Sequence, residues 1–387
     1  MGWARGPSTI DDQPSTFRIG LTGDFLDAAG RLAFPDVGLD LLEAPADSAQ
    51  ARRVEWEFIA EDPSEITPEI AARYDAIVAL RPRFTARTVS GADRRLALVA
   101  RFGVGYDRVD VPALTRAGVL LAISPDGVRR PVAQAVLTFI LALAGRLIEK
   151  DRVTRQGQGW ARASEFMGLG VTGRTLGLVG VGNIGRDVVR LVRPFEMDVL
   201  GYDPYAPSGL EGVRSVDLET LLRESDFVSV NCPLNEQTHH LIGARELGLM
   251  KPSSYLINTA RGPIVDEAAL YRALHEHRIA GAGLDVFEQE PTPPENPILR
   301  LDNVVVTPHA LCWTDECFRG NGAQALGHCL ALARGEPPTR GLVNPEALDH
   351  PWLRERLRLF GERWAATPSS GRGRRRHTRR RDLGGPP

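Results

Sequence analysis

The 387-residue sequence predicts an α/β fold in which helices cover parallel β-sheets. Short apolar runs typical of buried strands alternate with spans of helical period. One of these runs leads straight into a glycine-rich turn and then into a helical span. Most of the others end in glycine or polar residues, as expected for an open sheet whose ligands bind beyond the carboxyl ends of the strands.

Two successive sets of strands predict two such sheets. The first set covers residues 17–21, 54–58, 74–80, 96–100 and 119–122, and the second covers residues 176–179, 199–202, 227–232, 255–259, 282–287 and 304–307. Residues 124–127 predict a turn, 130–147 a long apolar helix that leads into the second set, and 266–277 an amphipathic helix. Arg81, Arg83 and Arg101 follow strands of the first set, and we expect solvent around them rather than substrate.

The segment 180–185, Gly-Val-Gly-Asn-Ile-Gly, lies between an expected strand and an expected helix. Strand, GxGxxG and helix in this order predict a dinucleotide-binding Rossmann domain, although the motif alone also fits an ordinary glycine turn. Gly180 permits the tight turn, Gly182 lets the backbone approach a pyrophosphate, and Gly185 lets helix and strand pack closely. The helix N-terminus then offers N–H groups to the anion.

Asp203 follows the next strand at the distance where an acid binds the ribose hydroxyls of the cofactor. By itself it also fits a surface turn before Pro204. No Arg or Lys follows closely to receive a 2′-phosphate, so the sequence predicts NAD rather than NADP as the cofactor.

Composition and charge exclude several classes of protein. The apolar fraction of 43% and the charged fraction of 25% are typical of a soluble globular protein, and no apolar run predicts a membrane span or a signal peptide. The four cysteines lack metal-ligand spacing, so we expect reduced thiols, no metal and a cytoplasmic location. Residues 362–382 carry eight Arg against two acids, but no aromatic residues alternate with the arginines. We therefore expect a solvated, disordered tail and no nucleic-acid partner.

Four further motifs follow one another in the second half of the chain. They are Val230–Leu234 with Thr238, Asn258–Asp266, Gly283–Phe287 with Glu290-Pro291, and Thr307-Pro308-His309. Over about residues 17–345 the chain resembles the D-isomer-specific 2-hydroxyacid dehydrogenase family, which includes phosphoglycerate dehydrogenase and glyoxylate/hydroxypyruvate reductase. Motifs in register are far more specific than any single motif.

The resemblance implies that Arg261, Glu290 and His309 are the catalytic residues. It also implies that Asp285 holds the nicotinamide carboxamide and that backbone at Val104 and Gly105 receives the substrate carboxylate, which Arg261 also binds. Further cofactor-binding positions would be Asn183, Ile184, Cys232, Pro233, Thr238, Thr259 and Ala260. The family is usually homodimeric. The implied reaction is the NAD-dependent interconversion of a small 2-keto acid and its D-2-hydroxy acid.

The resemblance further implies two Rossmann-like domains, with the NAD-binding doubly wound sheet inserted into a discontinuous, flavodoxin-like substrate domain. We expect the substrate domain at residues 17–122 and 309–345, the NAD-binding domain at 123–308, and a C-terminal extension with the Arg-rich tail at 346–387. A short extension disfavours the longer, allosteric phosphoglycerate dehydrogenases.

The chemistry calls for the same residue types independently. Reduction of a keto acid creates an alkoxide that must be protonated, and histidine is a suitable acid near neutral pH. A carboxylate such as Glu290 beside His309 favours imidazolium, and the planar fork of Arg261 can bind a carboxylate and polarise a keto oxygen.

Two departures and two alternatives remain. His309 precedes Ala310-Leu311-Cys312-Trp313, where the family often has a small residue and then glycine, so the pocket wall can be bulkier. Arg108 stands where the related motif usually has Asn. The same fold also serves a dinucleotide-responsive regulatory scaffold of the corepressor type, and phosphite dehydrogenase has a similar catalytic set. The intact Arg261, Glu290 and His309 favour the dehydrogenase.

Overall fold

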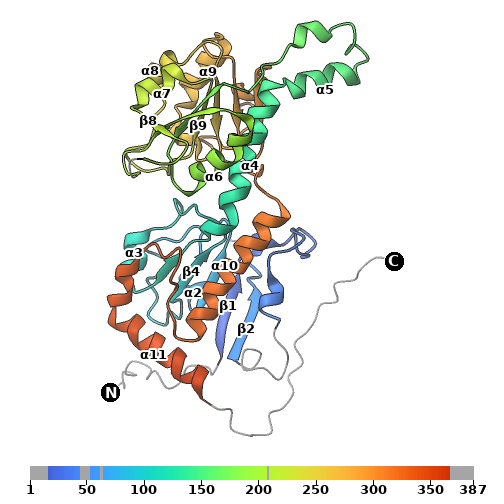
Figure 1. The fold of residues 1–387 in the computed structure, drawn as a ribbon. Helices are drawn as coiled ribbons and strands as arrows, with labels where there is room; N and C mark the ends of the chain where they lie inside the picture. The colour runs from blue at the N-terminus through green and yellow to red at the C-terminus, as the bar shows by residue number, and fades with distance from the viewer. Residues whose placement is uncertain (1–15, 44–52, 62–63, 207–208, 367–387) are drawn as a thin grey trace, which may run out of the picture. The chain divides into compact units, whose positions relative to one another are not determined.

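The computed structural model describes residues 16–43, 53–61, 64–206 and 209–366. The chain forms two compact units, each built on a parallel sheet (Figure 1). Unit 1 comprises residues 1–128 and 318–387, and unit 2 comprises Arg129–Cys317. The predicted α/β class with two parallel sheets is confirmed. The Arg-rich tail lies outside the described residues.

Unit 1 contains a five-stranded parallel sheet in the order β2-β1-β3-β4-β5, the flavodoxin-like order. Its strands are β1 (Phe17–Leu21), β2 (Val54–Phe58), β3 (Ala76–Ala79), β4 (Leu98–Arg101) and β5 (Leu120–Ala122). Its helices are α2 (Pro68–Ala71), α3 (Val111–Arg116), α11 (Pro351–Ala365) and the part of α10 (Asp315–Ala333) that follows Cys317. The central strands β3 and β4 are buried along their whole length, as parallel strands covered on both faces must be.

The C-terminal part of the chain completes unit 1. Asn344 accepts a hydrogen bond from the N–H of Leu121 at 2.7 Å and donates one to the carbonyl of Val119 at 2.9 Å. On α11, Arg356 pairs with the fully buried Asp75, which also binds Arg95. The sequence did not predict α11, although its buried Leu353, Arg356 and Phe360 recur at helical spacing.

Unit 2 contains a seven-stranded parallel sheet in the order β12-β11-β10-β9-β6-β7-β8. Its strands are β6 (Thr175–Val179), β7 (Asp198–Tyr202), β8 (Arg214–Ser215), β9 (Phe227–Val230), β10 (Tyr255–Asn258), β11 (Gly281–Leu284) and β12 (Val304–Val306). The strand order reverses between β6 and β9, which is the doubly wound arrangement of a dinucleotide-binding sheet. Its α-helices are most of α4 (Pro125–Ala144), α5 (Leu147–Arg155), α6 (Asn183–Val192), α7 (Leu218–Glu224), α8 (Ala244–Leu249) and α9 (Glu267–His275).

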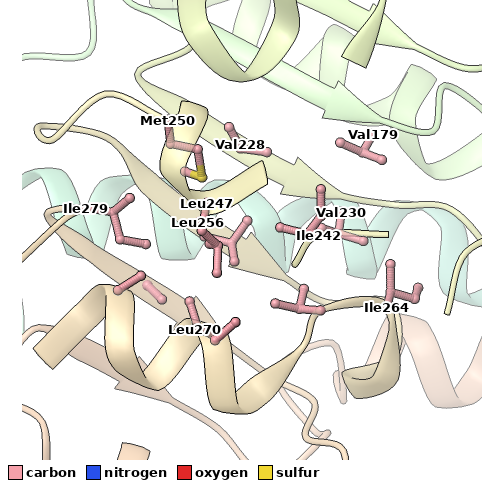
Figure 2. Packing of buried hydrophobic residues seen from close by; sticks show 14 of the residues in the cluster. Val179, Val228, Val230, Ile242, Leu247, Met250, Leu256, Ile264, Leu270 and Ile279 are labelled. Carbon is pink, nitrogen blue, oxygen red and sulfur yellow. The ribbon is translucent and has the colours of Figure 1, made fainter. Parts of the chain in front are cut away.

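Alternating residues of β6 and β9 belong to two hydrophobic cores, one on each face of this sheet. Val179 and Val228 pack with α8 and α9 residues in the cluster of Figure 2. Leu178 and Phe227 pack instead with residues of α4 and α6. Both faces are therefore buried, and only the strand ends are left for a site.

The predicted turn at 124–127 and the helix at 130–147 are corrected by the structure. α4 begins at Pro125 and ends at Ala144. Proline fits the first turn of a helix because it lacks only an N–H that would have no intrahelical partner. α4 is also long and apolar enough to span a membrane, but most of it is buried inside the structure, as in a core helix.

Candidate active site

The glycine-rich loop joins β6 to α6 as the sequence predicts. Gly180 has φ of +98°, and a Cβ there would lie 2.7 Å from the backbone nitrogen of Cys232. Gly182 and Asn183 are exposed, and a Cβ on Gly182 would meet no atom within 4 Å. Gly185 packs against the carbonyl of Gly180. The loop thus holds its backbone open to a ligand at the N-terminus of α6.

Asp203 lies at the end of β7 and is tied to this loop. Its Oδ2 accepts a hydrogen bond from the N–H of Val181 at 2.9 Å, and its Oδ1 accepts one from Tyr205 at 2.9 Å. It forms no ion pair with any of the described residues. Burial raises the pKa of the nearby Cys232 thiol to about 11, and the charge of Asp203 adds to this shift. The Cys232 thiol is therefore neutral at physiological pH.

Glu290 and His309 form a direct pair in unit 2. The Nδ1 atom of His309 lies 2.8 Å from Oε2 of Glu290, and Oε1 of Glu290 accepts the N–H of Phe287 at 3.1 Å. Burial raises the pKa of Glu290, but the hydrogen bond and charge of His309, the N–H of Phe287 and the charge of Arg261 outweigh it. The pKa of Glu290 consequently lies below its usual value, so its carboxylate is ionised at neutral pH.

Arg261 lies in the loop after β10, and its positive charge helps to lower the pKa of Glu290. The buried Asn258 holds that loop by donating to the carbonyl of Arg261 at 2.9 Å and accepting from the N–H of Ala260 at 3.1 Å. Gly262 packs so closely that a Cβ would lie 1.9 Å from the carbonyl carbon of Phe287. The structure therefore brings Arg261, Glu290 and His309 together.

Asp285 anchors the segment that carries His309. Its Oδ1 accepts hydrogen bonds from the Thr307 hydroxyl at 2.7 Å and from the N–H groups of Ala310 at 2.9 Å and Leu311 at 3.1 Å. These donors flank His309, whose φ of +56° is rare for a residue other than glycine. Sequence reasoning missed this anchoring, because the partners of one carboxylate oxygen leave no pattern in the sequence.

Of the other predicted cofactor residues, Ile184 lies in the first turn of α6, and the rest lie on the loops after β9 and β10. Thr238 donates to the carbonyl of Pro233 at 2.6 Å and fixes the turn after β9. The Thr259 hydroxyl is buried and has no hydrogen-bond partner among the described residues. An orphaned hydroxyl at this edge fits a site that a polar cofactor completes. The described residues contain no cluster that could hold a metal ion.

Val104 and Gly105 lie in unit 1, in the loop after β4. The carbonyl of Gly105 accepts a hydrogen bond from Nε of Arg101 at 3.1 Å, and that of Ala79 accepts one from Nη1 of Arg101 at 3.2 Å. Arg101 is buried, so the expectation that solvent surrounds it is wrong. Arg81 and Arg83 are exposed as expected.

The doubly wound sheet and its glycine-rich loop place the protein among the dinucleotide-binding α/β proteins. Residues 137–310 match the family model "D-isomer specific 2-hydroxyacid dehydrogenase, NAD binding domain". Glyoxylate reductase of Korarchaeum cryptofilum is 41% identical over 298 residues, which are 76% of this chain and 90% of that protein.

Solved structures agree with this similarity. A glyoxylate reductase from Paecilomyes thermophila has a TM-score of 0.71 at 27% identity, over 86% of this chain and 99% of that one. An NADPH-dependent glyoxylate/hydroxypyruvate reductase from Sinorhizobium meliloti has a TM-score of 0.70 at 28% identity, over 86% and 97% of the two chains. The chain belongs to the D-isomer specific 2-hydroxyacid dehydrogenase family. It is an oxidoreductase that interconverts a 2-keto acid and a 2-hydroxy acid with a nicotinamide dinucleotide.

Proposed function

We propose that this enzyme reduces a small 2-keto acid of the glyoxylate type to the D-2-hydroxy acid with NADH, using His309 as the acid. The contact between His309 and Glu290, beside the charge of Arg261, is the observation that carries the proposal. The similarity to the glyoxylate reductase of Korarchaeum cryptofilum, at 41% identity, supports a short substrate.

In the proposed mechanism the bound dinucleotide supplies the hydride, and the chain supplies the proton and the orientation. Glu290 accepts the hydrogen of Nδ1, so Nε2 of His309 is the atom that gives a proton to the developing alkoxide. The ionised Glu290 holds the imidazole ring through this contact, so that Nε2 faces away from the carboxylate. Arg261 binds the substrate carboxylate through its guanidinium fork.

We propose NAD as the preferred cofactor because Asp203 presents a carboxylate beside the glycine-rich loop. NADH should exceed NADPH by at least about tenfold in kcat/KM, since a carboxylate opposing a phosphate is worth more than about 1 kcal/mol. Asp203→Asn removes the charge and keeps one acceptor oxygen for the N–H of Val181 or of Tyr205, so it should reduce this preference. Equal use of both cofactors by the wild-type enzyme would contradict the assignment.

We propose that the residues after His309 limit the length of the substrate. Leu311 and Cys312 are half-buried, and the side chain of Trp313 is partly exposed. An NADH-oxidation screen against glyoxylate, hydroxypyruvate, pyruvate and branched 2-keto acids should show the highest kcat/KM for the shortest acids. An NAD-reduction assay with phosphite tests the alternative reaction, and turnover there above that of every hydroxy acid would overturn the proposal.

We also propose a cytoplasmic homodimer. Exposed apolar side chains gather in one stretch of unit 2, at Leu147, Ile148, Trp160 and Met167, and Trp160 is 99% exposed. We propose that a second copy of the chain covers these side chains in the dimer. Ile148→Glu should lower the mass measured by light scattering from dimer to monomer, whereas Leu299→Glu, a matched change of an exposed apolar residue elsewhere, should not.

A further inference from the structure

Unit 1 contains a cavity of about 550 Å³ that the residues discussed so far do not line. Its walls come from residues 86–94, from the end of α3 and from the start of α11. The first two segments precede β4 and β5, so the cavity lies at the amino-terminal edge of the sheet. Val104 and Gly105 follow β4 and lie at the opposite edge. The cavity is therefore separate from the loop that carries Val104 and Gly105.

Arg94 is a half-buried cation in the wall of this cavity and pairs with no carboxylate among the described residues. Its Nη1 donates to the carbonyl of Val89 at 3.0 Å and its Nη2 to that of Ala117 at 2.6 Å. The guanidinium stacks over Trp352 at 4.5 Å, and its buried Nε has no partner among the described residues. Burial lowers the pKa of Arg94. A buried cation without a counter-ion is costly, and an anion would offset that cost.

Arg95 provides a contrast in the same part of the fold. Its guanidinium pairs with the buried Asp75, and Arg356 uses the same carboxylate. Asp75 is thus fully engaged by its own arginines. Arg94 adds a further positive charge near Arg356, and no carboxylate of the described residues forms an ion pair with it.

Two further donors line the cavity. Arg116, in the last turn of α3, is exposed and makes no hydrogen bond or ion pair with the described residues. Nδ1 of His350 accepts the N–H of Trp352 at 3.2 Å, which leaves Nε2 as the nitrogen that carries the hydrogen. His350 also caps the 15-residue helix α11, whose N-terminus adds positive potential. None of the residues that line the cavity is acidic.

We propose that the cavity formed by Arg94, Arg116, His350 and Trp352 is a second ligand site, which binds a metabolite-sized anion through a carboxylate or phosphate group. Its volume lies within the range of small-molecule sites. Val89 and several alanines supply apolar wall, and the arginines supply charge-assisted hydrogen bonds.

The test is calorimetric titration of the enzyme saturated with NADH, because the glycine-rich loop would otherwise also bind the probe. Orthophosphate and citrate serve as probes for the two anionic groups, at constant ionic strength. We expect one site per chain with a dissociation constant in the millimolar range or tighter. Arg116→Gln should weaken binding at least about fivefold, and Arg94→Gln more, because each removes a charge-assisted hydrogen bond.

Arg300→Gln is the matched control, since Arg300 is exposed and its side chain makes no hydrogen bond or ion pair with the described residues. It should bind both probes like the wild type. Arg116 makes no contact that folding requires, so its variant keeps the test valid if Arg94→Gln fails to fold. Absence of binding, binding unchanged by Arg116→Gln, or an equal loss in Arg300→Gln would overturn the proposal. Binding of only one probe decides between carboxylate and phosphate.

Discussion

His309 and Glu290 lie nineteen residues apart in the chain, yet Nδ1 of the histidine is 2.8 Å from Oε2 of the glutamate. Neighbouring parallel strands bring them together, because Glu290 comes from the loop after β11 and His309 follows β12. This pairing fixes which ring nitrogen faces away from the carboxylate. The effects expected for His309→Gln and Glu290→Gln depend on this pairing.

His309→Gln should lower kcat by about 10²- to 10⁴-fold, the usual contribution of general acid–base catalysis. NADH affinity should survive, since the glycine-rich loop and Asp203 lie elsewhere in unit 2. Steady-state kinetics and NADH fluorescence titration on the same preparation measure both. Near-normal turnover would mean that another group is the acid, and loss of NADH binding would mean that His309 is structural.

Glu290→Gln should lower kcat by about tenfold, because the single amide oxygen can accept from His309 or from the N–H of Phe287 and holds the imidazole less firmly. The pKa of Glu290 is lowered in the folded protein, so its ionised form stabilises the fold above the unfolded pKa. That contribution disappears as pH falls through the folded pKa. Wild type should therefore be the more stable at neutral pH and the two should converge in acid, as followed by thermal unfolding. A turnover equal to that of the wild type would contradict the role of Glu290.

Asp285→Ala should reduce kcat by about tenfold or more, because the N–H groups of Ala310 and Leu311 lose their acceptor and His309 loses its fixed position. Asp285→Asn keeps an oxygen for these donors and should retain more activity than the alanine variant. Kinetics of both variants, with circular dichroism as a folding control, make the comparison. Equal loss in the two would show that the charge of Asp285, and not its anchoring of the segment, is what matters.

Asp75→Asn should lower the free energy of unfolding by about 3–5 kcal/mol, because Arg95 and Arg356 would remain buried without an anion. Asp349→Asn is the control, since its pair with Arg354 is exposed and such pairs contribute about 0–1 kcal/mol. Urea denaturation measures both variants. Similar losses in the two would contradict the structural role assigned to Asp75.

Local pattern was enough to predict the described strands except the two-residue β8. The family resemblance singled out Arg261, Glu290 and His309, and parallel strands place the residues that follow them at one edge. Local pattern failed where burial depends on distant segments. Arg101 resembles a surface arginine until the carbonyls of Ala79 and Gly105 are seen around it. The sequence likewise did not predict α11, because many of its residues are charged. Its Arg356 is buried because it pairs with the distant Asp75.

The split of unit 1 across the chain has a consequence for synthesis on the ribosome. Residues 129–317 emerge as a complete unit, whereas β5 lacks Asn344 and Asp75 lacks Arg356 until the last part of the described chain has left the exit tunnel. We therefore expect unit 2 to fold before unit 1, which reverses the usual order in which the N-terminal domain folds first during translation. Stalled nascent chains that end before Asn344 should resist protease within unit 2 and be cut within residues 17–122. Chains long enough to expose all of α11 should resist in both.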